Sequence, residues 1–122
     1  MGQESESYAI AHSDEHERTG TWRLVRRSLG CSSFGVNLVE IMPGESLPEH
    51  DETERDQEEL FFVLAGDPTL MIDGVEHAIP TGTFARVDPE PRRTVRNDGA
   101  QVASVLIVSA PRSSGYEPMP WA

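Results

Sequence analysis

The sequence contains no lysine, and its single cysteine, Cys31, has no partner with which to form an internal disulfide. All ten basic residues are arginines, and with 21 acidic residues they leave a formal net charge of −11. The negative electrostatic field of such a chain repels DNA, RNA and anionic membranes. The sequence shows no basic face that would compensate for it. We therefore expect neither a nucleic acid nor a membrane as a partner.

Long apolar runs are also missing. The longest, Leu60 to Ala65, is far too short to cross a membrane. The first ten residues are acidic and lack the basic and apolar stretches of a secretory signal. Together with the single cysteine, these absences predict a cytoplasmic protein. The 122 residues, 37% of them hydrophobic, suffice for one domain with its own core.

After an acidic N-terminal arm, residues 1–20, short runs of β-branched and aromatic residues alternate with Gly, Pro, Asn and Asp. This alternation is typical of strands and turns, and no segment has a sustained helical period. Asp73-Gly74, between two runs, predicts a tight hairpin turn with positive φ at both residues. The expected strands are Thr21–Arg26, Phe34–Met42, Leu60–Leu64, Thr69–Ile72, Val75–Ile79, Thr83–Val87, Thr94–Arg96 and Val102–Val108.

Strands at this spacing predict an all-β sandwich or barrel over residues 21–110. The strand Leu60–Leu64 is apolar on both faces, so both faces need cover. The tail, residues 111–122, is rich in proline and carries several large apolar side chains. We expect this tail to pack on the barrel, and the remaining apolar face to be buried in a homodimer.

The first segment with residues suited to chemistry runs from Gly44 to Gly66. His50 follows Gly44 after five residues, and Glu59 stands six residues before Gly66. His50 and Glu52 are two apart and lie on one face if the segment is extended.

The second such segment runs from Gly82 to Asn97 and contains Arg93. Together the two segments resemble the paired motifs of the cupin superfamily, G-x5-H-x-H-x3–4-E-x6-G and G-x5-P-x-G-x2-H-x3-N. The resemblance covers roughly residues 34–108. It implies a double-stranded β-helix, or jelly-roll, barrel that is commonly dimeric.

The departures from these motifs concern the metal that three histidines and a glutamate hold in cupins. Here the first histidine slot is His50 and the glutamate slot is Glu59. The second histidine slot holds Glu52, or Glu54 if the extra residues precede it, and the third holds Arg93. Arginine stays protonated and cannot coordinate a metal. We therefore expect no cofactor, with a divalent metal at His50, Glu52 and Glu59 as the alternative.

The residues favour a small-molecule-binding cupin that works without a metal. Strand phase predicts that His50, Glu59 and Arg93 meet inside the barrel, with the Arg93 cation where the metal charge would sit. If the protein is an enzyme, His50 and Glu59 are its candidate acid–base residues. The predicted ligand-binding residues are His50, Glu59, Arg93, Phe61 and Arg86.

Two parts of this pocket have alternatives. Arg86 either points into the lumen beside Arg93 or pairs with Asp88 on the surface. Phe34 and Phe84 are, with Phe61, the candidates for an apolar lining.

Two other functions stay open. One is a metal-dependent cupin enzyme of the isomerase, lyase or dioxygenase type, in which His50 and carboxylates hold a divalent metal. The other is a non-catalytic dimeric binding module, in which His50 and Glu59 form an idle hydrogen-bonded pair. Barrels of this kind host many chemistries, so the fold alone does not choose among them.

Overall fold

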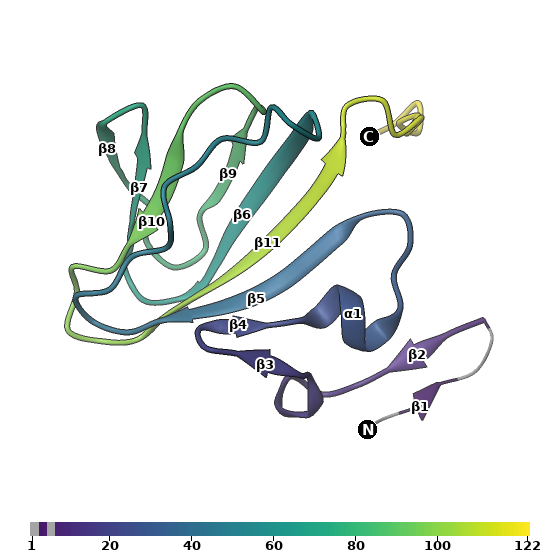
Figure 1. Ribbon diagram of the computed structural model, residues 1–122, viewed down its shortest axis with the longest axis horizontal. Coiled ribbons are helices and arrows are strands. Elements are labelled where there is room, and N and C mark those ends of the chain that lie inside the picture. Colours follow the sequence, from purple (N-terminus) through teal and green to yellow (C-terminus); the bar gives the residue numbers. More distant parts are fainter. Residues whose placement is uncertain (1–2, 5–6) are drawn as a thin grey trace.

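Two antiparallel sheets face each other in the computed structural model, which describes residues 3–4 and 7–122 (Figure 1). The larger sheet has the strand order β3-β4-β5-β11-β6-β9, and the smaller has the order β10-β7-β8. The strands of the larger sheet are β3 (Arg18–Thr19), β4 (Trp22–Arg23), β5 (Gly35–Ile41), β6 (Gln57–Ala65), β9 (Phe84–Val87) and β11 (Ala103–Pro111). Those of the smaller sheet are β7 (Thr69–Ile72), β8 (Val75–Ala78) and β10 (Arg93–Arg96). This is the all-β barrel expected from the strand pattern, in the jelly-roll form that the resemblance implies.

The core lies between the two sheets and is built from alternate residues of their strands. On β6 the inward residues Phe61 and Val63 are 3% and 0% exposed, whereas the outward residues Leu60 and Leu64 are 37% and 48% exposed. The other buried apolar side chains are Val39, Ile41, Leu47, Leu70, Ile79, Val87, Val95, Ala103, Val105 and Ile107. Period-2 alternation therefore separates the core of the barrel from its outer face.

Most strand predictions agree with the structure to within a few residues. The hairpin at Asp73-Gly74 is confirmed: φ is 49° at Asp73 and 79° at Gly74, and Ile72 pairs with Val75 across the turn. Two strands are longer than expected: β6 begins at Gln57 rather than Leu60, and β11 ends at Pro111 rather than Val108. Gln57 and Glu59 are therefore part of the sheet.

The predicted strand Thr21–Arg26 is wrong beyond Arg23, because the helix α1 occupies Val25–Leu29. Gly30 closes this helix in the left-handed conformation, φ 75°, and donates its backbone N–H to the Arg26 carbonyl at 2.8 Å. A glycine after the last helical residue, with arginines in the last turn, is a common helix stop. α1 lies beside β5 and contacts it (Figure 1).

Asn97, which ends the second motif, holds a turn in place. Asn97 is fully buried, and its Nδ2 donates to the carbonyls of Ile41 at 2.8 Å and Gln101 at 2.7 Å. Its Oδ1 accepts the Gly99 N–H at 3.0 Å. The side chain thus ties the β10–β11 turn to β5 and satisfies three groups inside the protein.

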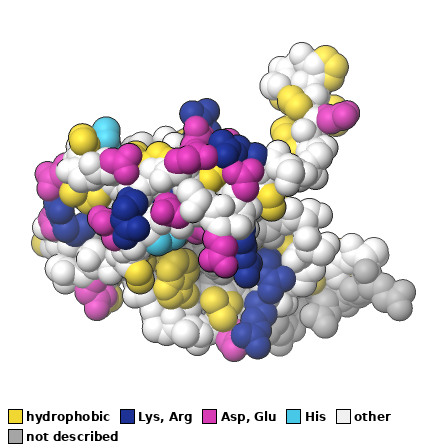
Figure 2. Space-filling model, turned by 45° about the horizontal axis from the view of Figure 1, so that its top comes forward, with side chains coloured by type: hydrophobic (Ala, Val, Ile, Leu, Met, Phe, Trp, Pro, Cys, Tyr) yellow, Lys and Arg dark blue, Asp and Glu magenta, His cyan; other side chains and the backbone are white. Residues whose placement is uncertain are grey.

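The ends of the chain extend beyond the barrel. β1 (Gln3–Glu4) pairs with β2 (Ala9–Ile10), a 3-10 helix follows at Ser13–Glu15, and β3 then joins the edge of the larger sheet through β4. The C-terminal tail stands clear of the barrel (Figure 2). The tail side chains Tyr116, Met119 and Trp121 are 77%, 61% and 84% exposed, so the expected packing of the tail on its own barrel is not observed. Neither helix of the described chain is long and apolar enough to reach across a bilayer.

Candidate functional site

The fold brings His50 and Arg93 together as direct cross-strand neighbours. The segment before β6 runs antiparallel to β10, with isolated bridges at Ser46–Arg96 and His50–Arg93. The His50 N–H donates to the Arg93 carbonyl at 3.1 Å, and the Arg93 N–H donates to the His50 carbonyl at 2.8 Å. Residues that exchange both bonds face the same side of a sheet, so both side chains point toward the lumen.

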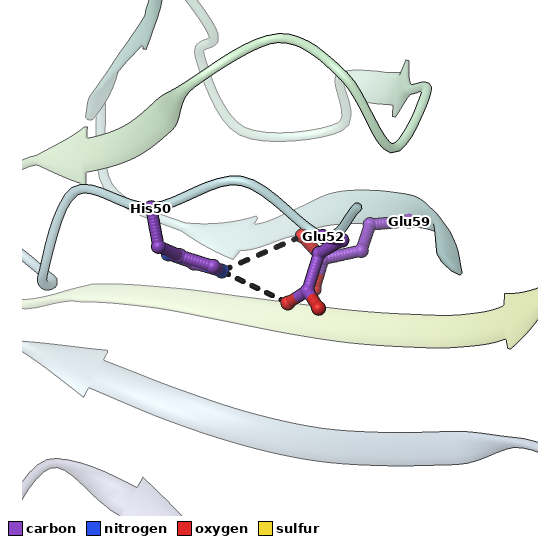
Figure 3. A group of neighbouring side chains, drawn as sticks. All are labelled: His50, Glu52 and Glu59. Carbon is purple, nitrogen blue, oxygen red and sulfur yellow. Dashed lines mark hydrogen bonds and ion pairs between the residues drawn. The ribbon is translucent and has the colours of Figure 1, made fainter. Parts of the chain in front are cut away.

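The imidazole of His50 is held by one backbone group and directed at two carboxylates (Figure 3). Its Nδ1 lies 3.0 Å from the Pro48 carbonyl oxygen, which can only accept, so Nδ1 carries a hydrogen. Its Nε2 lies 3.0 Å from Glu52 Oε1 and 4.0 Å from Glu59 Oε1. Because Nδ1 is the donor to Pro48, a proton or another cation must lie between Nε2 and these oxygens for the contact to be favourable.

Glu59 comes from β6, in phase with Phe61, and its side chain is only 9% exposed. Its Oε1 lies 3.5 Å from Arg93 Nε, whose side chain is fully buried. Both atoms are buried and make no hydrogen bond to the described residues. The two charges therefore compensate each other in a part of the site that solvent does not reach.

The rest of the Arg93 guanidinium faces away from the lumen. Its two terminal nitrogens donate to the carbonyls of Val87, Asp88 and Pro89, in the connection between β9 and β10. Only Nε remains directed at Glu59. Arg93 is thus a fixed internal cation rather than a mobile clamp for an incoming anion.

The environment of Glu59 acts on its protonation. Burial raises the pKa of the Glu59 carboxyl above its usual value, and the negative charge of Glu52 raises it further. The positive charge of Arg93, followed by His50, lowers it and offsets part of the rise. A buried carboxyl with a raised pKa beside an imidazole is suited to moving a proton.

The same residues test whether a metal fits. His50, Glu52 and Glu59 can each offer one ligand atom within 4.8 Å of the others, so three donors converge. The fourth position is held by Arg93, which has no lone pair to donate and brings a positive charge to Glu59. The set therefore fits a three-donor divalent site, but not the three-histidine, one-glutamate site of the motif. Glu54, the other candidate for the second slot, is exposed outside this group.

These side chains line a cavity of about 210 Å³ inside the barrel. Its apolar wall includes Phe61, as predicted, and Trp22, which the sequence analysis missed. Its polar end also includes Asn37, Gln57 and Ser109. The period-2 pattern of the strands could have placed these residues on the inner face of the sheet. Gln57 lies two residues before Glu59 on the same face of β6, and Asn37 lies on the face of β5 that carries its core residues. Gln57 and Ser109 were missed because the predicted strands began after Gln57 and ended before Ser109. Asn37 lay inside a predicted strand and was overlooked, because nothing in the local sequence marks it as part of a pocket.

Three side chains expected near the ligand lie elsewhere. Arg86 pairs with Leu60 across β9 and β6, so it faces outward with Leu60, and its Nε contacts Asp88 at 3.3 Å. This corrects the alternative that placed Arg86 beside Arg93 in the lumen. Phe84 is 67% exposed on the same outer face and stacks on Phe62, with ring centroids 4.2 Å apart. Phe34 lines a neighbouring cavity rather than the lumen.

The chain matches one family model and several solved structures. The family model Cupin_2, a cupin domain, matches residues 37–109. A cupin protein from Bacteroides fragilis aligns with a TM-score of 0.79 at 18% identity, over 96% of this chain and 94% of that one. A Cupin 2 conserved barrel domain protein from Salinispora arenicola has a TM-score of 0.60 at 20% identity, over 68% and 67% of the two chains.

A further solved structure has a higher sequence identity. It is described as a sugar phosphate isomerase of the cupin superfamily from Silicibacter pomeroyi, and it aligns with a TM-score of 0.62 at 28% identity. The alignment covers 73% of this chain and 57% of that one. Comparison with curated proteins gives no match.

Proposed function

The chain belongs to the cupin domain family, and we propose that its barrel binds a small polar molecule without a resident metal. The observation that carries this proposal is the pairing of charges in the lumen. Glu59 faces the buried Arg93 cation at 3.5 Å, and Glu52 faces His50 Nε2 at 3.0 Å. With a proton on Nε2, each carboxylate has its own cation, and no metal is needed to make the burial of these charges tolerable.

The free hydrogen-bonding groups of the lumen suit a ligand that is polar and uncharged in the part that lies there. Asn37, Gln57 and Ser109 line the lumen, and their side chains make no hydrogen bond to the described residues. Amide and hydroxyl groups of this kind bind hydroxyl and carbonyl groups, while the rings of Trp22 and Phe61 cover apolar ligand faces. A small hydroxylated molecule matches both sets of groups.

The arrangement also supports acid–base chemistry on such a ligand. His50 Nε2, Glu52 and Glu59 lie close enough to share and pass one proton, and His50 is held in place by its Nδ1 bond to Pro48. A reaction that moves a proton between two positions of the ligand, such as an isomerisation, needs only these groups. Arg93 then stabilises ionised Glu59 as the proton leaves it.

The ligand half of the proposal is tested with a panel of neutral polyols and monosaccharides in a thermal unfolding assay. We expect at least one at millimolar concentration to raise the melting temperature. Gln57→Trp, which places a large ring in the lumen from a half-buried lining position, should abolish the effect. Stabilisation that persists in Gln57→Trp, or is absent across the whole panel, would overturn the proposed binding site.

The metal half is tested by chelation. We expect an excess of EDTA to leave the melting temperature unchanged, because the proposed site holds no metal ion that the chelator could remove. A fall on chelation that zinc, nickel, manganese or iron restores would favour the metal site instead.

That metal site is the second candidate, and one observation favours it. The Nδ1–H bond of His50 to a backbone carbonyl is the outer contact typical of metal-bound histidines, and it leaves Nε2 beside two carboxylates. A bound divalent ion would act there as a Lewis acid on a ligand oxygen. Glu52→Gln distinguishes the two proposals, because it should remove any metal-dependent rise in melting temperature but leave a metal-independent polyol effect measurable.

A further inference from the structure

Almost every arginine of this acidic protein is matched to a carboxylate. Of the ten arginines, eight form an ion pair with Asp or Glu in the described chain. They are Arg18, Arg23, Arg27, Arg86, Arg92, Arg93, Arg96 and Arg112. With 21 acidic residues in the sequence, an arginine without a carboxylate partner is the exception.

The two exceptions lie in one place. Arg26, on α1, donates to the Cys31 carbonyl at 3.2 Å and makes no ion pair with the described residues. Arg55, just before β6, makes none either. Both side chains are exposed, and both line a single cavity of about 360 Å³ together with the hydroxyl-bearing Ser32 and Ser33. We name this cavity the vestibule.

The vestibule adjoins the lumen. Asn37, Gln57 and Ser109 line both cavities, so the polar end of the lumen is also the inner wall of the vestibule. Gly35 leaves the space beside Ser109 open, because a Cβ at that position would lie 2.7 Å from the Ser109 hydroxyl. The two cavities are therefore adjacent, with the side chains of Asn37, Gln57 and Ser109 between them.

We propose that the vestibule holds an oxyanion, the phosphate or carboxylate group of a ligand whose uncharged hydroxylated part lies in the lumen. Two cations without carboxylate partners, flanked by two hydroxyls, offer the donors that such a group requires. The assignment of the hydroxylated part rests on the proposed function. The anion site itself depends only on Arg26 and Arg55.

The lumen cannot take this anionic group. The terminal nitrogens of Arg93 are occupied by backbone carbonyls, and Glu52 and Glu59 repel a third negative charge. The two cavities thus divide a ligand by charge, with its anion at Arg26 and Arg55 and its neutral part near His50. This division orients the neutral part toward the residues that can move a proton.

The test compares ligands that differ by one group, using calorimetry at low salt on the full chain. D-ribose 5-phosphate should bind at least about tenfold more tightly than D-ribose, as one charged hydrogen bond contributes on this scale. D-ribonate distinguishes a carboxylate from a phosphate as the preferred anion. Inorganic phosphate probes the vestibule alone.

The variants are Arg26→Gln, Arg55→Gln and their combination, with Arg27→Gln as the matched control. Arg27 lies on the same helix but pairs with Glu17 at 3.6 Å and does not line the vestibule. The double variant should bring the phosphate ester down to the affinity of D-ribose, and Arg27→Gln should leave it unchanged. An unchanged melting temperature shows that each variant is folded.

The outcomes separate this inference from the proposed function. Loss of inorganic phosphate binding in the double variant supports the vestibule site even if no sugar binds, in which case the lumen proposal fails. Equal affinity for all anions and D-ribose, or an anion preference that survives in the double variant, overturns the vestibule site.

Discussion

Arg93 is the residue on which the chemistry of the lumen depends. A fully buried arginine is costly unless its charge is compensated and its donors are satisfied. Here three carbonyls satisfy its terminal nitrogens, and Glu59 at 3.5 Å compensates its charge. The sequence alone identifies Arg93 as occupying a histidine slot. It does not show that the guanidinium is turned away from the ligand, because side-chain direction depends on the β9–β10 connection.

Glu59 should make the stability of the protein depend on pH. Its folded pKa lies above the unfolded value, mainly through burial, so the folded state holds its proton more tightly. Its contribution to the free energy of unfolding therefore declines as pH rises from about 4.5 through the folded pKa.

Glu59→Gln removes this titration. The difference in free energy of unfolding, variant minus natural protein, should move in favour of the variant as pH rises from 4 to 7. Denaturant unfolding at several pH values measures it, with Glu58→Gln, an exposed neighbour on β6, as the control. A difference that moves the other way would mean that Arg93 outweighs burial.

At the scale of elements, the motif glycines have unequal roles. Gly66 and Gly82 both adopt φ of 89°. A Cβ at Gly66 would lie 2.8 Å from the Ala103 Cα on β11, whereas at Gly82 nothing lies within 4 Å. Gly66 therefore allows β6 and β11 to approach, and Gly82 supplies only the turn conformation.

Alanine substitutions distinguish these roles. Gly82→Ala should cost about 1 kcal/mol of left-handed strain. Gly66→Ala carries the same strain plus a backbone clash, so it should cost at least about 1 kcal/mol more. Denaturant midpoints of the two variants measure the gap; equal losses would refute a close approach at Gly66.

The positions of most strands and the hairpin at Asp73-Gly74 could be predicted, because turn residues and period-2 alternation are local signals. The beginning of α1 was wrongly predicted as the end of a strand. The β-branched Val25 favours a strand, whereas Gly30 five residues later is a signal for the end of a helix. That error also hid Arg26, which α1 carries to the vestibule. Arg55 gives no local signal at all, because its role depends on which arginines lack carboxylates in the folded chain.

At the scale of the whole molecule, the outer face of β6 and β9 lacks cover. Leu60, Leu64 and Phe84 are 37%, 48% and 67% exposed. The apolar tail emerges beside this face, where a cavity is lined by Leu60, Val108 and Tyr116. We propose that a second copy covers the face and that the two tails contribute to the contact, as an isologous dimer allows.

The dimer is tested by light scattering at micromolar concentration. We expect twice the mass of the 13.5 kDa chain, and Phe84→Ser with Leu64→Ser should halve it. Val75→Ser is the matched control, because Val75 is 57% exposed but lies on β8 of the other sheet. A natural protein that is monomeric under these conditions contradicts the dimer.

The most direct test of the central claim, that Arg93 replaces a metal ligand and its charge, is the metal content of the purified protein and of Arg93→His. Both are prepared without a histidine tag and analysed for zinc, nickel, manganese and iron. The natural protein should carry less than about half an equivalent, because arginine cannot coordinate. Arg93→His completes two imidazoles and two carboxylates and should approach one equivalent, while Arg93→Lys, which keeps the cation, should not. A full equivalent on the natural protein, or a folded Arg93→His that stays metal-free, would contradict the account.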